Sequence, residues 1–363
     1  MVVSHQEDIP PVRPFVTRYE TESGVCRSCG RRTRARHPGQ VSDASGAAGS
    51  HLGPRAVALA CWLNKSLGIP AGKVAAVLHQ TAGLEVTAGG VHQLMHRTAR
   101  RLEPTYDALV EGIRNSPAVS PDETGWRVGG YRAWLWVFVG QGVTVYHVAD
   151  GRGYEQAAVI LGEEYSGVLE RDGWHSYRRF TSATHQTCLA HLLRRMNGMI
   201  ADSVGGQARV PHAARRILHD ALALREARDQ GALEPGALEQ EVDALGERMD
   251  ELLGWSPTHE PNDRLLDHLW RERDHLFTFL TCPGTEATNW RSEQGIRPMV
   301  VARKNWGGNA EWRGARTTEV LASVLRTAHQ QGRDPVGVLL GALRSPTPVL
   351  ADLLIPGRAP PTP

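Results

Sequence analysis

The sequence has little lysine, few cysteines and no long apolar run, and these shortages exclude several classes of protein. Lysine occurs only at Lys65, Lys73 and Lys304, so arginine supplies nearly all of the positive charge. No stretch of 18 consecutive apolar residues is present, so we expect no membrane partner. The first residues lack the basic and apolar regions of a secretory signal peptide. Five scattered cysteines argue against a disulfide framework and are typical of a reducing, cytoplasmic environment.

Charge is unevenly distributed along the chain, although the net charge is only +2. Residues 27–36 carry five arginines and no acid, and residues 291–316 carry six basic and two acidic residues. Residues 220–260 carry eleven acidic and three basic residues. Two basic regions on either side of an acidic one predict that a phosphate-rich partner contacts the basic regions. The length of 363 residues predicts two or three domains.

A Cys-x₂-Cys pair followed by glycine lies near the N-terminus, at Cys26 and Cys29. Such a pair supplies two of the four ligands of a tetrahedral Zn²⁺ site. No second Cys-x₂-Cys occurs, so His37, His51 and Cys61 are the nearby residues that could complete the site. A zinc site and a pair of cysteines that binds no metal are both compatible with this pattern.

Residues 52–115 show helical periodicity, with expected helices at 56–67, 71–81 and 88–101. Thr87 is placed to cap the third of these helices. Its expected buried face consists of Val91, Leu94, Met95, Thr98 and Leu102. Its expected polar face consists of His92, Gln93, His96, Arg97 and Arg100. The pattern fits a helix-turn-helix that places Arg97 and Arg100 on DNA, and it fits an ordinary helical hairpin equally well.

Strand signals replace the helical pattern from residue 116 to residue 190. Apolar runs predict strands at 119–122, 132–139, 143–149, 167–172 and 185–190, with a helix at 153–161. Acids stand at the ends of the first and fourth of these strands, at Asp122 and Asp172. Asp and Glu are depleted inside strands, and a carboxylate beside an apolar sheet is costly without a partner charge. These two acids are therefore candidates for a functional site.

The rest of the chain divides into a helical part and a mixed part. We expect helices at 189–200, 213–230, 237–253 and 264–281, and another at 317–332. The acidic helices interrupt a strand-rich region, so we interpret them as an insertion. The expected organisation is an N-terminal segment (1–50), a helical DNA-binding region (51–115), a catalytic core (116–190 and 284–345), a helical insertion (191–283) and a proline-rich tail (346–363).

A third acid, Glu293, follows the expected insertion at the start of a helix. Carboxylates from three different elements suit two Mg²⁺ or Mn²⁺ ions, which together activate the attacking oxygen and stabilise the leaving oxygen of a phosphodiester. In an extended chain Glu123 points away from Asp122, so we expect it to support the site without binding metal. Glu286 and Glu311 are the alternatives to Glu293.

These motifs together resemble the IS66-type DDE transposases of bacterial insertion sequences. The matching residues are Asp122-Glu-Thr-Gly-Trp, Trp134-Leu-Trp, Asp172-Gly-Trp-His-Ser-Tyr, His185-Gln-Thr-Cys-Leu-Ala-His-Leu-Leu-Arg, Asn289-Trp-Arg-Ser-Glu-Gln-Gly-Ile-Arg-Pro and Arg303-Lys-Asn-Trp-Gly-Gly. They lie in the family's order between about residues 118 and 333. The sequence departs from the family's usual third motif, because Trp290, Arg291 and Ser292 stand where a second Asn and a His are usual. The family also usually has a cysteine pair before the one seen here.

The resemblance implies an α/β fold with an RNase H-like mixed-sheet catalytic core and a helical insertion, preceded by a helical, helix-turn-helix-like region. It implies that Asp122, Asp172 and Glu293 are the catalytic residues of a DNA transposase, which cleaves and transfers strands at the bacterial nucleoid. The expected partners are double-stranded DNA (the element's terminal inverted repeats and target DNA), further copies of the chain on that DNA, and accessory proteins of the same element. An RNase H-like nuclease without strand transfer and an inactive relic that only binds DNA are the alternatives.

Several further residues are assigned roles around these acids. Arg297, Arg303 and Lys304 follow Glu293 closely, and we expect them to contact DNA phosphates, with simple surface charge as the alternative. Cys188 and His191 form a Cys-x₂-His pair, which we expect to support the second acid motif rather than to bind zinc. Tryptophans beside the motifs are candidates for stacking on an extruded base: Trp126, Trp174 and Trp306.

Overall fold

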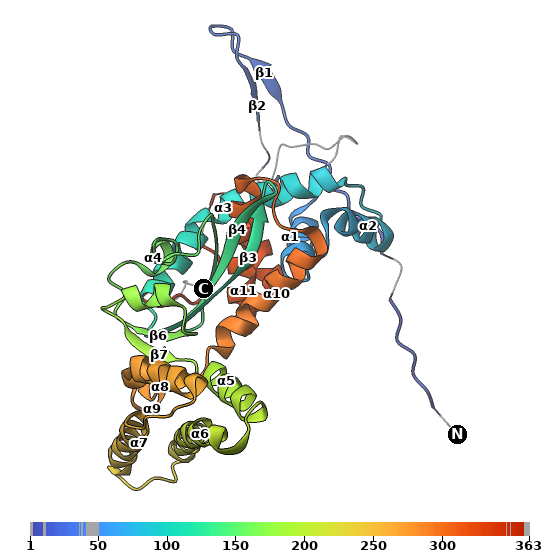
Figure 1. Ribbon diagram of the computed structural model, residues 1–363. Coiled ribbons are helices and arrows are strands. Elements are labelled where there is room, and N and C mark those ends of the chain that lie inside the picture. Colours follow the sequence, from blue (N-terminus) through green and yellow to red (C-terminus); the bar gives the residue numbers. More distant parts are fainter. Residues whose placement is uncertain are drawn as a thin grey trace.

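A five-stranded mixed sheet forms the centre of the molecule, in the order β5-β4-β3-β6-β7 (Figure 1). The computed structural model describes residues 3–9, 12–35, 37, 39–40, 51–345, 347–348 and 350–358. The antiparallel strands are β3 (Ala118–Val128), β4 (Tyr131–Val139) and β5 (Thr144–Ala149). The strands that continue the sheet parallel to β3 are β6 (Val168–Arg171) and β7 (Thr184–Thr187). This mixed α/β architecture is compatible with the RNase H-like core that we expected.

The strand β3 is longer than the sequence prediction, which ended it at residue 122. It continues to Val128, where Gly129 and Gly130 form a two-residue turn into β4. Both glycines have positive φ, 61° and 82°, which is the conformation that a tight hairpin turn requires. The acid motif that begins at Asp122 therefore lies inside a long strand and not at the end of a short one.

The two faces of the sheet pack against different helices. On one face, Trp126 of β3 and the residues Leu135 and Val137 of β4 belong to a core with α10 (Trp290–Trp306) and α11 (Trp312–Gln330). On the other face, residues such as Trp136 and Phe138 belong to a core with α3 (Ala88–Arg114) and α4 (Tyr154–Leu161). Because side chains alternate along a strand, neighbouring residues of β3 face these two different environments.

The helix α11 covers the outer edge of the sheet along β5. Three N–H groups of this edge strand donate hydrogen bonds of 2.7–3.0 Å to side chains of the helix. The pairs are Thr144 with Thr327, Tyr146 with Ser323, and Val148 with Glu319. Strand residues two apart are separated by about 6.7 Å and helix residues four apart by about 6 Å, so the two spacings match. The helix thus satisfies donors that an edge strand would otherwise leave open.

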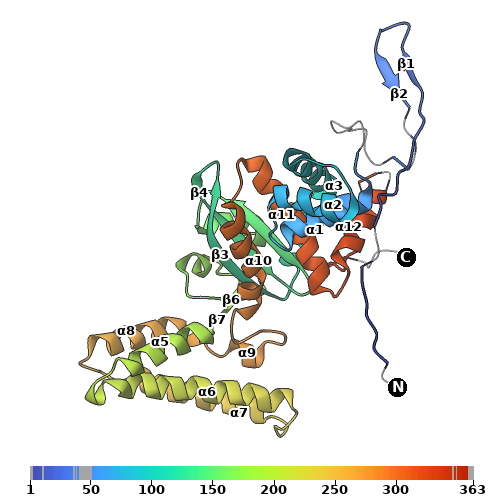
Figure 2. The ribbon, with the colours of Figure 1, turned by 90° about the vertical axis from the view of Figure 1, so that its right-hand side faces the viewer.

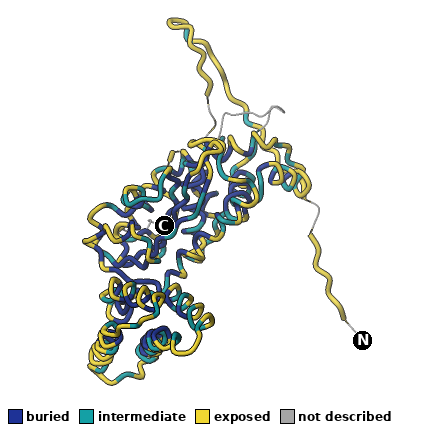
Figure 3. The backbone as a smooth tube through the Cα atoms, viewed as in Figure 1, coloured by how far each residue is buried: buried dark blue, intermediate teal, exposed yellow. Residues whose placement is uncertain are grey.

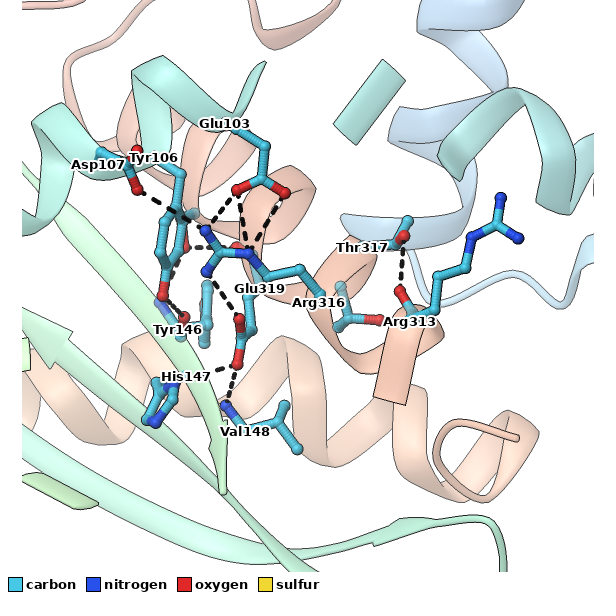
Figure 4. A network of polar contacts seen from close by, with 12 residues as sticks. Glu103, Tyr106, Asp107, Tyr146, His147, Val148, Arg313, Arg316, Thr317 and Glu319 are labelled. Atoms are coloured by element: carbon cyan, nitrogen blue, oxygen red, sulfur yellow. Dashed lines mark hydrogen bonds and ion pairs between the residues drawn. The ribbon is translucent and has the colours of Figure 1, made fainter. Parts of the chain in front are cut away.

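A polar network joins α3, α11 and β5 (Figure 4). Arg316 of α11 forms ion pairs with Glu103 of α3 and with Glu319 of its own helix, and its guanidinium lies 4.1 Å from the ring centroid of Tyr106. The Tyr106 hydroxyl donates a 2.9 Å hydrogen bond to the carbonyl of Tyr146 in β5. These contacts fasten the long helix α3 to the sheet.

Three helices precede the sheet, as the sequence predicted: α1 (Pro54–Lys65), α2 (Ala71–Ala82) and α3. The Thr87 side chain caps α3 by accepting a 3.0 Å hydrogen bond from the Gly90 N–H, which confirms that prediction. The helix does not end near residue 101 but continues through Pro104 to Arg114, because its second half packs on α11 and β5. The C-terminal helix α12 (Pro335–Arg344) packs on α1 and α11.

The polar face predicted for α3 is partly wrong. His96 is buried, and its Nδ1 lies 2.7 Å from the Thr317 hydroxyl of α11. Arg97 is half-buried and Arg100 is exposed. The five predicted apolar positions of this helix are all buried. The helix therefore lies against the core along more of its surface than a free DNA-reading helix would.

A second group of helices has a hydrophobic core of its own and projects from the end of the sheet at β6 and β7 (Figure 2). Its members are α5 (Leu189–Ala201), α6 (Arg209–Asp229), α7 (Ala237–Leu253), α8 (Glu260–Glu272) and α9 (Thr278–Thr281). The single helix predicted at 264–281 is wrong, because α8 ends at Glu272. The Gln186 side chain of β7 bonds the Leu276 carbonyl and the Phe279 N–H, which holds the chain between α8 and α9 against the sheet.

The N-terminal region contains an exposed hairpin of β1 (Ser23–Val25) and β2 (Arg32–Arg34), which stands away from the buried interior of the molecule (Figure 3). Among the described residues, no helix combines the length and the apolar character that crossing a membrane requires.

Candidate active site

Asp122 lies in β3, and Asp172 directly follows the neighbouring parallel strand β6, beyond the point where the two strands cease to pair. β3 and β6 pair only at Ala118 with Val168 and at Val119 with Leu169. Asp122 therefore lies three residues beyond the last pair, and so does Asp172. Parallel strands run about 4.8 Å apart where they pair, so the register brings the two acids to the same level of the sheet.

Beyond this point β3 is no longer paired with β6, and the Asp122 carboxylate is hydrogen-bonded to the backbone of its own strand. Its carboxylate accepts a 2.8 Å bond from the N–H of Glu123, a backbone group that β6 no longer covers. The Asp172 carboxylate accepts a 2.9 Å bond from the N–H of Trp174, two residues later. Each acid is thus oriented by its own local backbone and keeps further lone pairs for a ligand.

The helix α10 carries Glu293 in its first turn and lies across the face of the sheet that bears Asp122. Gly295 makes this approach close, because a Cβ at this residue would lie 3.0 Å from Val139 and 3.3 Å from Val137. The start of the helix is also held by Cys188, whose buried sulfur accepts a 3.4 Å bond from the Asn289 N–H. Glu293 itself is exposed to solvent.

The charges of the acids converge on Asp122. Burial, followed by the negative charges of Glu123, Asp172 and Glu293, raises the pKa of Asp122 to about 7, and the Glu123 N–H opposes this rise. Both of the other proposed catalytic acids are therefore close enough to act on it. A divalent cation would relieve such repulsion, and carboxylate oxygens are the ligands that Mg²⁺ prefers. Within the described part of the chain, no three His, Cys, Asp or Glu side chains already have the arrangement of a metal site.

Glu123 points to the opposite face of the sheet, as its position in an extended strand predicted. It is buried, and it accepts hydrogen bonds of 2.6 Å from both Arg152 and the Tyr177 hydroxyl. The Arg152 guanidinium lies between two tryptophan rings, 4.9 Å from that of Trp134 and 3.8 Å from that of Trp174. Three of the sequence motifs thus meet around Glu123, but Arg152 lies outside all of them and was not found from the sequence.

A further buried acid, Glu170, was also missed. It lies on β6 two residues before Asp172, accepts a hydrogen bond from the Ser120 hydroxyl, and accepts a 2.6 Å bond from the Glu286 N–H. Burial raises the pKa of Glu170. The alternative acid Glu286 is held in ion pairs with Arg225 at 2.7 Å and Arg291 at 2.9 Å, so its charge is already compensated.

The strand end that carries Asp172 is joined to the second group of helices by a buried ion pair. The side chains of Arg171 and Glu272 are 1% and 0% exposed, and their charged atoms lie 2.9 Å apart. Arg178 adds a second ion pair to Glu272 at 2.7 Å, and the Thr187 hydroxyl donates to the same carboxylate. The last residue of α8 is thereby fixed beside the residue that precedes Asp172.

Comparison with known proteins places these motifs in a family. The model of the transposase IS66 family matches residues 49–317, a region that contains all three proposed acids. The chain belongs to this family. It is also similar to the uncharacterized protein y4qI of Sinorhizobium fredii (strain NBRC 101917 / NGR234), with 25% identity over 282 residues. That match covers 70% of this chain and 52% of y4qI, so the chain spans about half the length of this curated relative.

The basic residues expected to contact DNA in this IS66-family chain lie in different surroundings. Arg297 and Lys304 are exposed on α10. Arg303 is half-buried, and it donates hydrogen bonds to the Thr124 hydroxyl at 3.0 Å and to the Gly125 carbonyl. Arg303 is therefore anchored to the motif that begins at Asp122.

The cysteine pair of this IS66-family chain lies in the exposed β1–β2 hairpin. The pKa of the Cys26 thiol is lowered to about 6, first by its contact with the Ser28 hydroxyl and then by hydrogen bonds at Cys29. A low pKa favours the thiolate that binds zinc. Cys61 cannot complete a site there, because it is fully buried in α1 within the main core.

The remaining candidates are placed as follows. His191 is exposed on α5, whereas Cys188 is buried against the start of α10. Trp126 is 2% exposed and donates a 2.8 Å hydrogen bond to Asn309, so its ring is not available to an extruded base. Trp174 is half-buried under Arg152, and Trp306 lies 5.3 Å from the Lys65 ammonium.

Proposed function

We propose that this IS66-family chain is a DNA transposase whose residues Asp122, Asp172 and Glu293 hold two Mg²⁺ or Mn²⁺ ions. The observation that carries the proposal is the shared register of Asp122 and Asp172, together with the effect of both other acids on the pKa of Asp122. When bound, such ions activate the attacking oxygen and stabilise the leaving oxygen of a phosphodiester.

The residues around the acids have supporting roles in this proposal. Glu123 stays on the other face, where Arg152 neutralises it and the Tyr177 hydroxyl donates a hydrogen bond to it, and these contacts hold the strand that carries Asp122. Arg297, Lys304 and Arg303 lie on the same helix as Glu293 and supply positive charge for the DNA backbone. Arg97 and Arg100 on α3 supply further positive charge for binding DNA. The DNA partners are the element's terminal inverted repeats and the target site, at the bacterial nucleoid.

Three further elements belong to the proposal. Copies of the chain assemble on the DNA, because two ends of an element have to be joined to one target. Zn²⁺ binds at Cys26 and Cys29 with ligands from outside the pair. Accessory proteins of the same element assist the reaction.

The test is a strand-transfer assay with a labelled double-stranded element end in Mg²⁺. We expect Asp122→Asn, Asp172→Asn and Glu293→Gln each to reduce cleavage and joining by at least 100-fold, while DNA binding persists. The matched control is Asp150→Asn, at an exposed residue just after β5, which should leave both activities unchanged. Cleaved but unjoined products from wild type would identify a nuclease, and binding without cleavage would identify a relic.

A further inference from the structure

Three arginines line a pocket of about 540 Å³ at the hairpin end of β3 and β4. They are Arg127 of β3, Arg132 of β4 and Arg303 of α10, and the rest of the lining consists of Gly125, Trp126 and Gly307. Arg127 and Arg132 are exposed at the pocket, whereas Arg303 is half-buried in its wall. Of these three arginines, only Arg303 was expected from the sequence to contact phosphate.

Arg127 and Arg132 face each other directly across the hairpin. The Arg127 carbonyl accepts a 2.9 Å bond from the Asn309 N–H, so its backbone points away from β4. The two arginines are thus a pair without mutual backbone hydrogen bonds, for which the Cα atoms lie about 4.5 Å apart. Like charges directly opposite one another destabilise a sheet. A local conflict of this kind is expected where function requires it.

None of the three arginines has an acidic partner among the described residues. Arg132 lies 5.0 Å from the Trp134 ring, and Arg127 has a 3.4 Å contact with the Gly130 carbonyl. Both contacts orient a guanidinium without cancelling its charge. The pocket therefore holds three positive charges that an anion could neutralise.

The walls of the pocket are formed before any ligand binds. Arg303 reaches from α10 to the β3 backbone at Gly125, and Asn309 bonds the same strand edge on both sides of Val128. Gly308 has a φ of 121°, and a Cβ there would collide with the Arg127 carbonyl. Only glycine lets this segment close on the strand. A ligand thus meets a prearranged set of donors, which lowers the entropy lost on binding.

We propose that this pocket binds a phosphate of the DNA backbone away from the catalytic acids, a proposal that rests on the proposed function. Arg127 lies five residues after Asp122 on the same strand, which at about 3.3–3.4 Å per residue is a distance of roughly 17 Å. Because side chains alternate, Arg127 and Arg132 point to the face of Glu123, whereas Arg303 reaches the same strand from α10 on the face of Asp122. Arginine binds phosphate bidentately, and the rigid strand fixes the spacing.

The experiment measures the affinity of a double-stranded element end at several salt concentrations, without divalent metal so that no cleavage occurs. The test variant is Arg127→Gln/Arg132→Gln, and the matched control is Arg264→Gln on α8, an exposed arginine paired with Glu260. We expect the double variant to bind at least tenfold more weakly near 0.15 M salt, with a slope of log K against log salt that is shallower by one to two. The control should match wild type.

A neutral methylphosphonate placed at single positions of the DNA locates the contact. At the phosphate that the pocket contacts it should weaken wild type and leave the double variant unchanged. Equal losses in both proteins, or a double variant that binds like wild type, would overturn the pocket assignment alone. A wild type with no salt-dependent affinity for DNA would overturn the proposed function as well.

Two further measurements separate the remaining explanations. The melting temperature of the double variant should equal or exceed that of wild type, because two opposed charges are removed, and a lower value together with weak binding would indicate a structural role. Inorganic phosphate should compete with DNA only weakly. Tight phosphate binding that the double variant loses while it keeps wild-type DNA affinity would show a site for the free ion and overturn the proposal.

Discussion

Asp122 in β3 and Asp172 directly after β6 occupy equivalent positions, each three residues beyond the last paired residues of these two parallel strands. Asp172 follows Asp122 by 50 positions in the sequence, and paired residues of β3 and β6 differ by the same 50 positions. The spacing of the two acid motifs therefore matches the register of the sheet. The two strands no longer pair at this level, so the backbone aligns the two acids without a hydrogen-bond ladder between them.

Magnesium should stabilise the protein through these acids. Because Asp172 and Glu293 raise the pKa of Asp122, bound Mg²⁺ would relieve a repulsion that exists in the folded state alone. We expect Mg²⁺ at 10 mM to raise the melting temperature of wild type and of the Asp150→Asn control. The double variant Asp122→Asn/Asp172→Asn should show no such rise, and an equal rise in all three proteins would place the binding of the ion elsewhere.

Glu272→Gln should destabilise the protein strongly. The substitution leaves the fully buried Arg171 without its charged partner, which for a buried pair costs about 3–5 kcal/mol. Urea unfolding gives this value directly. The control Glu260→Gln removes an exposed ion pair with Arg264 and should cost about 0.5 kcal/mol or less. A small effect of Glu272→Gln would mean that Arg171 finds water or another partner.

The stability of the protein should rise between pH 8 and pH 9. Burial lowers the pKa of Lys65 to about 8 from 10.5, so the unfolded chain binds more protons in this range and unfolding becomes harder as pH rises. Burial raises the pKa of Cys61 to about 12 from 9.0, and this acts in the opposite direction above pH 9. The rise should therefore level off there.

Unfolding free energies measured from pH 7.5 to pH 10 test this expectation. Lys65→Met should remove the rise, because the titrating group is lost from beside Thr318 and Trp306. The control Lys73→Met, at an exposed position of α2, should keep it. A rise that survives in Lys65→Met would assign it to another group.

Ser323→Ala should cost about 1–3 kcal/mol, because the buried N–H of Tyr146 loses its acceptor. Ser182→Ala is the matched control, since Ser182 is exposed and its loss should stay within about 0.5 kcal/mol. Hydrogen exchange of the Tyr146 amide should accelerate in the first variant. Unchanged exchange would show that water or a neighbouring group replaces the hydroxyl.

The sequence predicted those features that depend on local pattern. The cap at Thr87, the apolar face of α3 and the side of the sheet that Glu123 faces all follow from the period of a helix or a strand. The acids were recognisable because carboxylates are rare beside apolar runs, although Asp122, which was expected at a strand end, lies inside β3. The distance between Asp122 and Asp172 was not predictable, since it depends on which strands pair and in what register.

Contacts between distant segments account for what was missed. His96 has a polar-face position in α3, but α11, more than two hundred residues later, covers it. The helix expected at 264–281 ends early because Gln186 of β7 binds the chain beyond it. Arg171 with Glu272, and Arg152 between two tryptophans, join residues whose partners no local pattern could name. The pairing of Arg127 with Arg132 in the pocket was missed because it depends on the two-glycine turn that joins β3 and β4.

The helix α11 covers the outer strand β5, and the chain also covers the outer strand at the other side of the sheet, β7. There the Thr278 hydroxyl donates a 2.7 Å bond to the His185 carbonyl, and the Phe279 N–H bonds the Gln186 side chain. Strand addition between copies needs an edge with open backbone groups. In the five-stranded sheet, backbone groups of both outer strands are already bonded to the chain's own side chains. If copies assemble on DNA as we propose, they would therefore meet through surfaces other than the edges of this sheet, and they could separate afterwards without breaking hydrogen bonds between its strands.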